Sequence, residues 1–245
     1  MPTTAVITGA NGGIGRALCS VFKAAGYRVV ALDVREGECE CDHFVPVDLQ
    51  KLCLQEGYRD SSLDRLRAEL PPEGLYALIN NAAVQRLGAT GQITPADWRE
   101  TLDVNLTAPF LLIQGLLGEL ERAGGSVVNI ASVHAKATKP GFVSYATSKA
   151  ALVGLTHSLA VDLGSRVRVN AICPAAVATP MLKAGFEGRA QQWQDLARMH
   201  PLGRIAEPEE VARAALFLVS PQAAFVSGTA LDLDGGISHR LHDPA

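Results

Sequence analysis

The feature that most constrains the fold is a repeated alternation of two kinds of segment along the chain. Short apolar runs rich in β-branched residues, such as TTAVIT and SVVNIAS, are typical of buried strands. Between them lie longer segments whose apolar residues recur at helical spacing. Strands that alternate with helices require a parallel sheet that helices cover on both faces. The predicted strands are residues 3–8, 27–33, 43–47, 75–81, 126–132, 166–173 and 229–235.

Capping residues locate two of the expected helices. Ser61 or Ser62 is the expected N-cap of the segment SSLDRLRAEL. Thr94, followed by Pro95, is expected to begin a long helix over TPADWRETLDVNLTAPFLLIQGLLGELERAG. Because proline lacks the N–H that a helix interior needs, this helix is predicted to break or bend around Pro109.

The chain of 245 residues shows no internal repeat, low-complexity run or compositional shift that would mark a linker. It is long enough to bury one large core, so we predict a single α/β domain over residues 1–245. Residues 181–205 are mixed and polar, with Gly185, Gly188 and Pro201, and are predicted to form a lid over the substrate.

Charge, hydropathy and cysteine usage exclude several functional classes. The net charge is −3 and no basic cluster is present, so nucleic acid is not an expected partner. The apolar run AALFLV is far below the ~20 residues that a membrane-spanning helix needs, and no secretory signal precedes the first strand. The five cysteines form no pairing framework, which favours a reducing compartment. The sequence therefore predicts a cytoplasmic protein without membrane contact.

A glycine-rich turn follows the first predicted strand and precedes an apolar-periodic helix. It reads TGANGGIG, with Gly9, Gly13 and Gly15 in the spacing G-x-x-x-G-x-G. Glycines at this place let the backbone approach a pyrophosphate, which the free N–H groups and the positive end of a helix N-terminus attract. The spacing differs from the usual dinucleotide fingerprint, and a turn with a purely structural purpose stays an alternative.

Asp33 ends the second predicted strand, at the distance of about 20 residues at which an acid binds the 2′-hydroxyl of a nucleotide ribose. A carboxylate there repels a 2′-phosphate, which favours NAD over NADP. Arg35 argues the other way, since a guanidinium two residues further on can bind that phosphate. No lysine or arginine stands at residues 10–12, so NAD stays the predicted cofactor. A plain turn residue is the structural alternative for Asp33.

Ser132, Tyr145 and Lys149 carry the chemistry that such a cofactor needs. Tyr145 and Lys149 are four residues apart in a predicted helix, so the phenol and the ammonium share one face. A nearby cation favours the phenolate, and each pKa unit corresponds to about 1.4 kcal/mol. Ser132 ends a strand-like run, where its hydroxyl can donate to an oxygen that gains negative charge. The pair Tyr-x-x-x-Lys alone is more typical of an ordinary helix surface, so the assignment depends on the rest of the chain.

With these residues in place, the chain resembles the short-chain dehydrogenase/reductase family over nearly its whole length. The matching motifs, in order along the chain, are TGANGGIG (8–15), Asp33, VDL (47–49), NNAA (80–83), Asn105 within DVNL, Ser132, YATSK (145–149) and PAAVATP (174–180). The resemblance implies a Rossmann-like, doubly wound parallel sheet of about seven strands. It also implies an NAD(P)-dependent oxidoreductase that acts on a secondary alcohol or ketone, and a homotetramer.

The resemblance further implies a role for each matching residue. Tyr145 would be the general acid and base, and Lys149 would lower its pKa and bind the nicotinamide ribose. Ser132 would orient the substrate oxygen, and Asn105 would help to hold a water in the proton relay. The residues that would contact the cofactor are Gly9, Asn11, Gly13, Ile14, Gly15, Asp33, Asp48, Leu49, Asn81, Ala82, Tyr145, Lys149, Val177 and Thr179.

Ala83 and Ala175 depart from the family pattern, which usually has glycine at both positions. Each adds one methyl group near the predicted cofactor, which puts the local backbone and the cofactor affinity in question. Cys39, Cys41 and His43 alternate along the chain. Their spacing is not that of the common zinc patterns, so no metal is predicted.

Gln85 and His134 are the candidate substrate residues. Family members that act on 3-hydroxybutyrate look similar at these positions, where a glutamine and a histidine hold the substrate carboxylate. Those members also carry a lysine three residues before the tyrosine, where this chain has Phe142. Sugar-acid dehydrogenases of the family can carry Gln-Arg, as Gln85-Arg86 does here. Rim residues that bond only to water are the alternative.

The main hypothesis is an NAD-dependent oxidoreductase that moves a hydride between nicotinamide and a small secondary alcohol or ketone, with a hydroxy acid or a sugar acid as the suggested substrate. The acid at Asp33 favours oxidation of the alcohol. A 3-oxoacyl-thioester (acyl-carrier-protein) reductase stays an alternative, although it would more often use NADPH, with basic residues near Asn11 or Asp33. A non-catalytic NAD-binding protein on the same scaffold would typically lack the tyrosine or the lysine.

Overall fold

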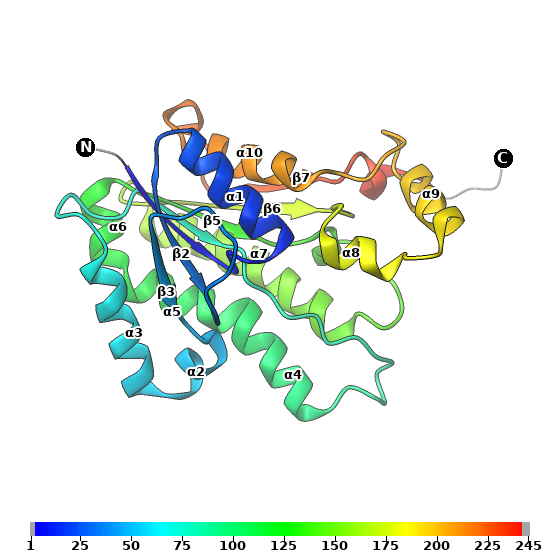
Figure 1. Ribbon diagram of the computed structural model, residues 1–245, viewed down its shortest axis with the longest axis horizontal. Helices are drawn as coiled ribbons and strands as arrows, with labels where there is room; N and C mark the ends of the chain where they lie inside the picture. Colours follow the sequence, from blue (N-terminus) through cyan, green and yellow to red (C-terminus); the bar gives the residue numbers. More distant parts are fainter. Residues whose placement is uncertain (1–2, 242–245) are drawn as a thin grey trace.

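The computed structural model describes residues 3–241, and residues 1–2 and 242–245 of the predicted domain lie outside the described residues. Within residues 3–241 the chain forms one sheet of seven strands in the order β3-β2-β1-β4-β5-β6-β7, and every neighbouring pair is parallel (Figure 1). The strands are β1 (Thr4–Thr8), β2 (Arg28–Asp33), β3 (His43–Pro46), β4 (Ala77–Asn80), β5 (Ser126–Ile130), β6 (Arg168–Pro174) and β7 (Ala230–Leu233). This confirms the predicted doubly wound α/β class.

Helices cover both faces of the sheet, as Figure 1 shows. Neighbouring residues of β1 point to opposite sides: Ile7 packs in a cluster with α1 and α10, whereas Val6 packs in a second cluster with α2, α3 and α5. The α-helices are α1 (Gly13–Ala24), α2 (Leu49–Leu54), α3 (Glu56–Ala68), α4 (Pro95–Leu102), α5 (Ala108–Gly115), α6 (Leu117–Ala123), α7 (Val143–Leu163), α8 (Pro180–Gly185), α9 (Ala190–Met199) and α10 (Pro208–Val219). The other helical turns are η1 (Asp103–Thr107), η2 (Val133–Ala135), η3 (Pro221–Ala223) and η4 (Ile237–His239).

The helix that was expected to begin at Ser61 or Ser62 begins earlier. α3 starts at Glu56 and contains both serines, and Ser62 is buried within it. The prediction is wrong because tertiary contacts extend the helix backwards. Tyr58, in the first turn of α3, accepts a hydrogen bond from the backbone N–H of Asp48 at 2.9 Å, which ties this turn to the start of α2.

Thr94 begins α4 as expected, because its Oγ1 accepts from the N–H of Asp97 at 3.1 Å in a capping box. The helical path continues through Pro109, contrary to expectation, and the bend of 61° lies at Leu116, between α5 and α6. A π-helical turn, η1, comes directly before α5. Pro109 therefore stands in the first turn of a new helical segment, where a missing N–H is tolerated.

The order of the strands brings the candidate site residues to one edge of the sheet. The carboxyl ends of parallel strands meet at the same edge, and a ligand crevice forms where the strand order reverses, here between β1 and β4. Gly9 follows β1, Asp33 ends β2, Asn81 follows β4 and Ser132 follows β5. Residues that are far apart in sequence are therefore brought to one crevice.

The segment predicted as a lid contains most of α8 and all of α9, drawn in yellow in Figure 1. A parallel bridge between Val177 and Ala206 closes its base. The Ala178 N–H donates to the Ala206 carbonyl at 2.8 Å, and the Ala206 N–H donates to the Ala176 carbonyl at 3.1 Å. The movement of this segment as a lid stays a prediction.

Among residues 3–241, no individual helix has both the length and the hydropathy of a membrane span. One bent pair, Pro95–Gly115 with Leu117–Ala123, reaches them only when its two parts are taken together.

Candidate active site

The glycine-rich turn follows a backbone path that side chains would block. Gly9 has a φ of 64°, in the left-handed region, and a Cβ there would stand 2.7 Å from the Cα of Ala82. A Cβ on Gly15 would stand 2.0 Å from the Gly9 carbonyl oxygen, and one on Gly13 would stand 2.7 Å from the Cβ of Thr179. The glycines thus bring the turn, the end of β4 and Thr179 together at the N-terminus of α1, where a pyrophosphate is favoured.

Thr8 and Asn81 fasten this turn to the end of β4. The Thr8 hydroxyl oxygen accepts from the backbone N–H groups of Asn81 and Ala82, both at 3.0 Å. Asn81 Nδ2 donates back to the carbonyls of Thr8 at 2.9 Å and Gly9 at 3.1 Å. The Asn81 amide, which was expected to contact the ribose region, therefore uses its donors to hold the turn. Sequence reasoning missed Thr8 as a site residue, although its place between a buried strand and the glycines was a usable signal.

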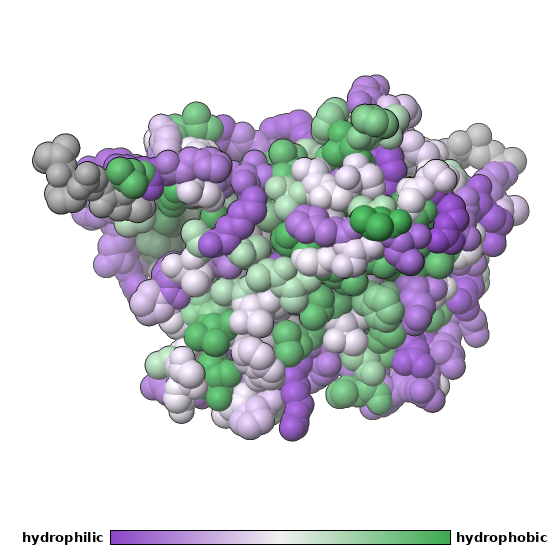
Figure 2. All heavy atoms as spheres, turned by 180° about the vertical axis from the view of Figure 1, so that it is seen from behind, coloured by the Kyte–Doolittle hydropathy of each residue, from purple (hydrophilic) through white to green (hydrophobic). Residues whose placement is uncertain are grey.

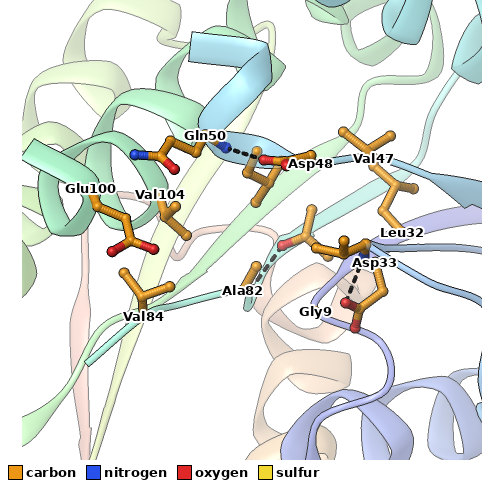
Figure 3. A pocket seen from close by; sticks show the side chains of 13 residues that line it. Gly9, Leu32, Asp33, Val47, Asp48, Gln50, Ala82, Val84, Glu100 and Val104 are labelled. Atoms are coloured by element: carbon orange, nitrogen blue, oxygen red, sulfur yellow. Dashed lines mark hydrogen bonds between the residues drawn. The ribbon is translucent and has the colours of Figure 1, made fainter. Parts of the chain in front are cut away.

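Asp33 lines a cavity of about 260 Å³ at the carboxyl ends of the strands (Figure 3). Its Oδ2 accepts from the backbone N–H of Asn11 at 2.9 Å, and its Oδ1 accepts from the N–H of Val34 at 2.8 Å. These two bonds fix the carboxylate between the glycine-rich turn and the end of β2. The cavity is lined by Thr8, Gly9, Leu32, Asp33, Val34, Val47, Asp48, Leu49, Gln50, Ala82, Val84, Glu100 and Val104.

This cavity fits the adenosine half of a dinucleotide. The Asp33 carboxylate is an acceptor for ribose hydroxyls, and the apolar side chains of Val47 and Leu49 suit a flat base. Figure 3 shows Asp48 turned towards Gln50 rather than into open space. Its Oδ1 caps α2 by accepting from the N–H groups of Gln50 at 3.0 Å and Lys51 at 3.1 Å. Asp48 is therefore a structural cap beside the predicted adenine site.

Other predicted cofactor residues lie outside the lining of this cavity. Val177 is buried and pairs with Ala206 at the base of the predicted lid. Thr179 caps α8, because its Oγ1 accepts from the N–H of Leu182 at 3.2 Å, and it packs on Gly13 as described above. Ile14 packs against the core cluster of α1 and α10. Val177 and Thr179 thus approach the glycine-rich turn from the β6 side.

Tyr145 and Lys149 both lie on α7, one turn apart. Lys149 is only 2% exposed, and its Nζ donates to the Ile130 carbonyl at 2.7 Å. The same Nζ lies 5.7 Å from the centroid of the Tyr145 ring. Ser132 is also buried, its Oγ accepts from the His134 N–H at 3.2 Å, and its side chain is hydrogen-bonded to that of Tyr145. The structure therefore brings the three predicted catalytic side chains together.

Burial dominates the pKa values of this group. It raises the pKa of Tyr145 above the ordinary value, and the hydrogen bond with Ser132 lowers it only in part. Burial also lowers the pKa of Lys149 to about 8, against an opposing effect of Cys173. Lys149 is not among the groups that shift the pKa of Tyr145 in this arrangement, so its effect on that pKa stays a prediction. At neutral pH Tyr145 is a protonated phenol, the form that donates a proton.

Asn105 ties the catalytic helix to the loop that follows β4. Its Oδ1 accepts from the Val84 N–H at 2.8 Å, and its Nδ2 donates to the Val84 carbonyl at 2.9 Å and to Ser148 Oγ at 3.0 Å. The buried side-chain amide is thus engaged with protein partners, so a relay water would be held by the backbone of this turn. Because Pro109 has no N–H, the Asn105 carbonyl lacks the donor that an α-helix would supply four residues further on.

His134 lies beside Tyr145, as a residue that binds the substrate must. Its ring stacks on Phe142 with the centroids 4.3 Å apart and meets the Tyr145 ring edge-on at 5.8 Å. Its Nδ1 lies 2.9 Å from the Thr138 hydroxyl. Burial, together with the charge of Lys139, lowers the pKa of His134, so the neutral imidazole is the form at neutral pH.

Gln85 and Arg86 are both exposed in the loop after β4. Arg86 is engaged in a two-point ion pair, because its Nε and Nη2 donate to the carboxylate of Glu100 at 2.7 and 2.8 Å. An arginine that is paired in this way is not free to bind a substrate carboxylate. The Gln-Arg pattern therefore gives no support to a sugar-acid site through Arg86, and Gln85 stays a prediction.

The two alanines that replace family glycines introduce no backbone strain. Within residues 3–241, no residue other than glycine has a positive φ, so Ala83 and Ala175 adopt ordinary conformations. The Ala175 N–H donates to the Leu233 carbonyl at 3.2 Å, which continues the pairing of β6 with β7. Across the described part of the chain, no group of three or more His, Cys, Asp or Glu side chains is arranged to hold a metal ion.

Comparison with known proteins covers nearly the whole chain. The family model described as "Enoyl-(Acyl carrier protein) reductase" matches residues 9–238. An acetoacetyl-CoA reductase of Rhizobium meliloti is 35% identical over 242 residues, which cover 96% of this chain and 98% of the relative.

Solved structures are similar over the same length. The ligand-free aldohexose dehydrogenase of Thermoplasma acidophilum has a TM-score of 0.91 and 31% identity, covering 100% of this chain and 97% of that one. A 4-hydroxyisoleucine dehydrogenase complexed with NADH has a TM-score of 0.86 and 27% identity, covering 98% of this chain and 100% of that one. A mutant of a 4-hydroxyisoleucine dehydrogenase, complexed with NADH and succinate, has a TM-score of 0.86 and 28% identity, covering 97% and 99%.

Proposed function

The chain belongs to the short-chain dehydrogenase/reductase family, and from that premise we propose that it is an NAD-dependent dehydrogenase of a small hydroxy acid. Its class, the NAD(P)-dependent oxidoreduction of hydroxyl and keto groups, is that of its relatives. The observation that carries the finer proposal is the edge-on contact of His134 with Tyr145. It gives a hydrogen-bonding group beside the phenol that acts on the substrate oxygen.

In the proposed reaction, bound NAD supplies the hydride acceptor. The Ser132 hydroxyl donates to the substrate oxygen, and Tyr145 Oη takes the proton of the substrate hydroxyl in oxidation and returns it in reduction. The Lys149 ammonium, held at the Ile130 carbonyl, stabilises the phenolate whenever Tyr145 has given up its own proton. The carbonyl of Asn105 holds the water through which that proton leaves.

The NAD preference rests on Asp33, whose carboxylate faces the cavity and is fixed by two backbone N–H groups. Arg35 is exposed, and its carbonyl accepts from Asn11 Nδ2 at 2.6 Å. The fixed carboxylate of Asp33 therefore lines the cavity, whereas Arg35 is not among the residues that line it. Solved neighbours include one complexed with NADH and one with bound NADP, so the preference for NAD depends on Asp33 alone.

The hydroxy-acid substrate rests on the surroundings of His134. In the tautomer whose Nδ1 accepts from the Thr138 hydroxyl, Nε2 carries the proton and can donate to a carboxylate. The imidazole is neutral, so the positive charge near this carboxylate would come from Lys139, whose Nζ lies 4.8 Å from the centroid of the Phe142 ring. The 4-hydroxyisoleucine dehydrogenase complex with succinate, a dicarboxylate, supports a carboxylate-bearing substrate.

Replacement of His134 with alanine is expected to separate acids from neutral alcohols. We expect His134→Ala to lower kcat/KM for the hydroxy acid by about tenfold or more, because a hydrogen bond to a charged group contributes about 1.5–3 kcal/mol. The neutral analogue without the acid group should lose much less. His43→Ala, at an exposed position of β3, is the matched control and should leave both values unchanged. Equal losses on both substrates would rule out the carboxylate site.

A second candidate function is the reduction of a 3-oxoacyl thioester, which the 35% identical acetoacetyl-CoA reductase favours. A kinetic screen of NAD and NADP against hydroxy acids, polyols and secondary alcohols, and of NADH and NADPH against acetoacetyl-CoA, decides between the two. The proposed function requires the highest kcat/KM with NAD and a hydroxy acid. The second candidate requires it with acetoacetyl-CoA and a reduced cofactor.

We further propose that the protein is a homotetramer. Among the described residues, exposed apolar side chains include Phe110, Val161, Phe217, Phe225 and Leu231. Figure 2 shows apolar side chains gathered over much of the rear face, which is typical of a surface that binds protein. The loop that precedes β7 abuts α7, because a Cβ on Gly228 would stand 3.2 Å from the Cβ of Ala160.

Light scattering should therefore give a tetramer for the wild type. Because a buried charge without a partner opposes association, Val161→Glu should shift the mass to a smaller species with an unchanged circular dichroism spectrum. A wild-type monomer would contradict the assembly. The cytoplasmic location, the single domain over residues 1–245 and the lid over 181–205 stay predictions.

A further inference from the structure

Three thiols gather where the loop between β2 and β3 meets α1. Cys39 and Cys41 stand in this loop, both partly exposed, with their Sγ atoms 4.0 Å apart. Cys19, on α1, is fully buried, which raises its pKa, and it lies close enough to Cys39 and Cys41 for both to raise that pKa further. A disulfide needs an S–S distance of about 2.05 Å, so side-chain rotation and a small shift of the loop would bring Cys39 and Cys41 within bonding distance. None of the three thiols has a part in the proposed reaction.

The same loop is fastened to the predicted nucleotide site. Asn11, in the glycine-rich turn, is bonded to residues 33 and 35, where the β2–β3 loop begins. Its N–H donates to Asp33 Oδ2 at 2.9 Å, and its Nδ2 donates to the Arg35 carbonyl at 2.6 Å. Gly37 packs on Asn11 so closely that a Cβ there would stand 2.4 Å from Asn11 Oδ1. The backbone of the loop at Gly37 is therefore in close contact with the side chain of Asn11.

Asp42 holds the other end of the loop. Its carboxylate accepts from the Val29 N–H at 2.8 Å and pairs with Lys23 Nζ at 2.6 Å. Cys39 and Cys41 thus lie between a fixed end at Asp42 and the contact of Gly37 with Asn11. Closing the 4.0 Å gap between the two sulfurs would strain the loop between these two contacts, and Asn11, which stands at one of them, bonds through its N–H to the Asp33 carboxylate.

We propose that Cys39 and Cys41 form a reversible disulfide and that this modification weakens dinucleotide binding. The oxidant is a small-molecule disulfide, such as glutathione disulfide. The thiolate of one cysteine attacks it, breaks its S–S bond and releases one small thiol. The thiolate of the second cysteine attacks the mixed disulfide, forms the Cys39–Cys41 bond and releases a second small thiol. Two protein thiols are oxidised, one small disulfide is reduced, and the two protons pass to the released thiolates.

Cys41, rather than Cys19, is the partner of Cys39. Cys19 is fully buried, and burial raises the pKa of its thiol, so it is neither accessible nor ionised for exchange. Cys41 reaches solvent, and its pKa is raised to about 11 by burial and by Cys39. Its thiolate fraction at neutral pH is small, so the exchange is expected to take minutes to hours. Such a reversible disulfide is compatible with a reducing compartment.

Peptide mass spectrometry tests the bond without any assay of function. The reduced protein is equilibrated with graded ratios of glutathione disulfide to glutathione, the free thiols are alkylated, and trypsin is added. Cleavage after Arg35 and Lys51 leaves Cys39 and Cys41 in one peptide, whereas Cys19 lies in another. We expect the 36–51 peptide to lose the mass of two hydrogens, to remain unalkylated, and to recover with dithiothreitol. A doubly alkylated peptide, a glutathione adduct at equilibrium or a link to the Cys19 peptide would overturn the assignment.

NADH fluorescence titration of the same samples tests the consequence. Disturbance of one charge-assisted hydrogen bond weakens binding by about tenfold, and we expect the Kd for NADH to rise by about that factor on oxidation. Cys41→Ser should bind NADH normally and should not respond to oxidation, whereas Cys53→Ser, which removes a thiol elsewhere, should respond as the wild type does. An oxidised wild type with an unchanged Kd would overturn the link to the nucleotide site. Absence of NADH binding in the reduced protein would instead count against the proposed function.

Discussion

Tyr145→Phe should lower kcat by about 10²–10⁴-fold, the range that a general acid or base contributes, while NADH still binds. The substitution removes only the phenol oxygen. The ring keeps its edge-on contact with His134 and its position near Lys149 Nζ. Steady-state kinetics with the best substrate of the screen, together with an NADH fluorescence titration, measure the two effects separately.

Tyr27→Phe is the matched control for this prediction. Burial raises the pKa of Tyr27 to about 12, and its ring packs against Phe22 at 5.0 Å, away from the crevice. Both tyrosines therefore have a raised pKa, and only position distinguishes them. Tyr27→Phe should leave turnover unchanged. Near-normal turnover in Tyr145→Phe, or equal losses in the two variants, would contradict the role of Tyr145.

Asp33→Asn should lower the preference for NAD over NADP, expressed as the ratio of kcat/KM values, by about a hundredfold. The substitution removes the charge that repels a 2′-phosphate, an effect of about 4 kcal/mol at 4 Å near a protein surface before screening. It keeps one of the two side-chain oxygens, so the N–H of either Asn11 or Val34 retains its acceptor. Arg35, exposed two residues further on, is then free to pair with the phosphate. Initial rates with both cofactors at saturating substrate give the ratio.

Asp42→Asn separates this effect from a general change of charge in the β2–β3 loop. Asp42 bonds to Val29 and Lys23 and does not line the cavity, so its variant should keep the wild-type preference. A wild type that already prefers NADP(H) would show that Asp33 does not select the cofactor. An unchanged ratio in Asp33→Asn would show the same.

The fold could be predicted because its signals are periodic and local. Alternating apolar runs and helical segments gave the parallel sheet, and the four-residue spacing of Tyr145 and Lys149 put both on α7. Helix boundaries that depend on tertiary contacts could not be predicted as well from the sequence. The first turn of α3 is held by the bond from the Asp48 N–H to Tyr58, and the path through Pro109 follows directly after a π-helical turn. Neither contact has a sequence signal of its own.

The hydrogen-bond partners and the burial of the site's side chains could also not be predicted from the sequence. Asn81 and Asn105 were singled out as functional, but their amides are bonded to the backbone at Gly9 and at Val84. The ion pair joins Arg86, in an irregular loop, to Glu100, in α4, fourteen residues further along the chain. The raised pKa of Tyr145 results from burial, which no spacing reveals. Motif spacing thus locates the site, whereas protonation states and free donors require the packed structure.

Transfer of a label tests the central claim most directly, because it follows the hydride itself. The substrate identified by the screen is prepared with deuterium on its carbinol carbon and incubated with NAD and the wild-type protein, and the NADH that forms is analysed by mass spectrometry. If the crevice holds the nicotinamide against a hydroxy acid, each NADH should carry one deuterium from that carbon, and Tyr145→Phe should form almost none. NADH without deuterium, or an equal yield from the tyrosine variant, would contradict hydride transfer at this site.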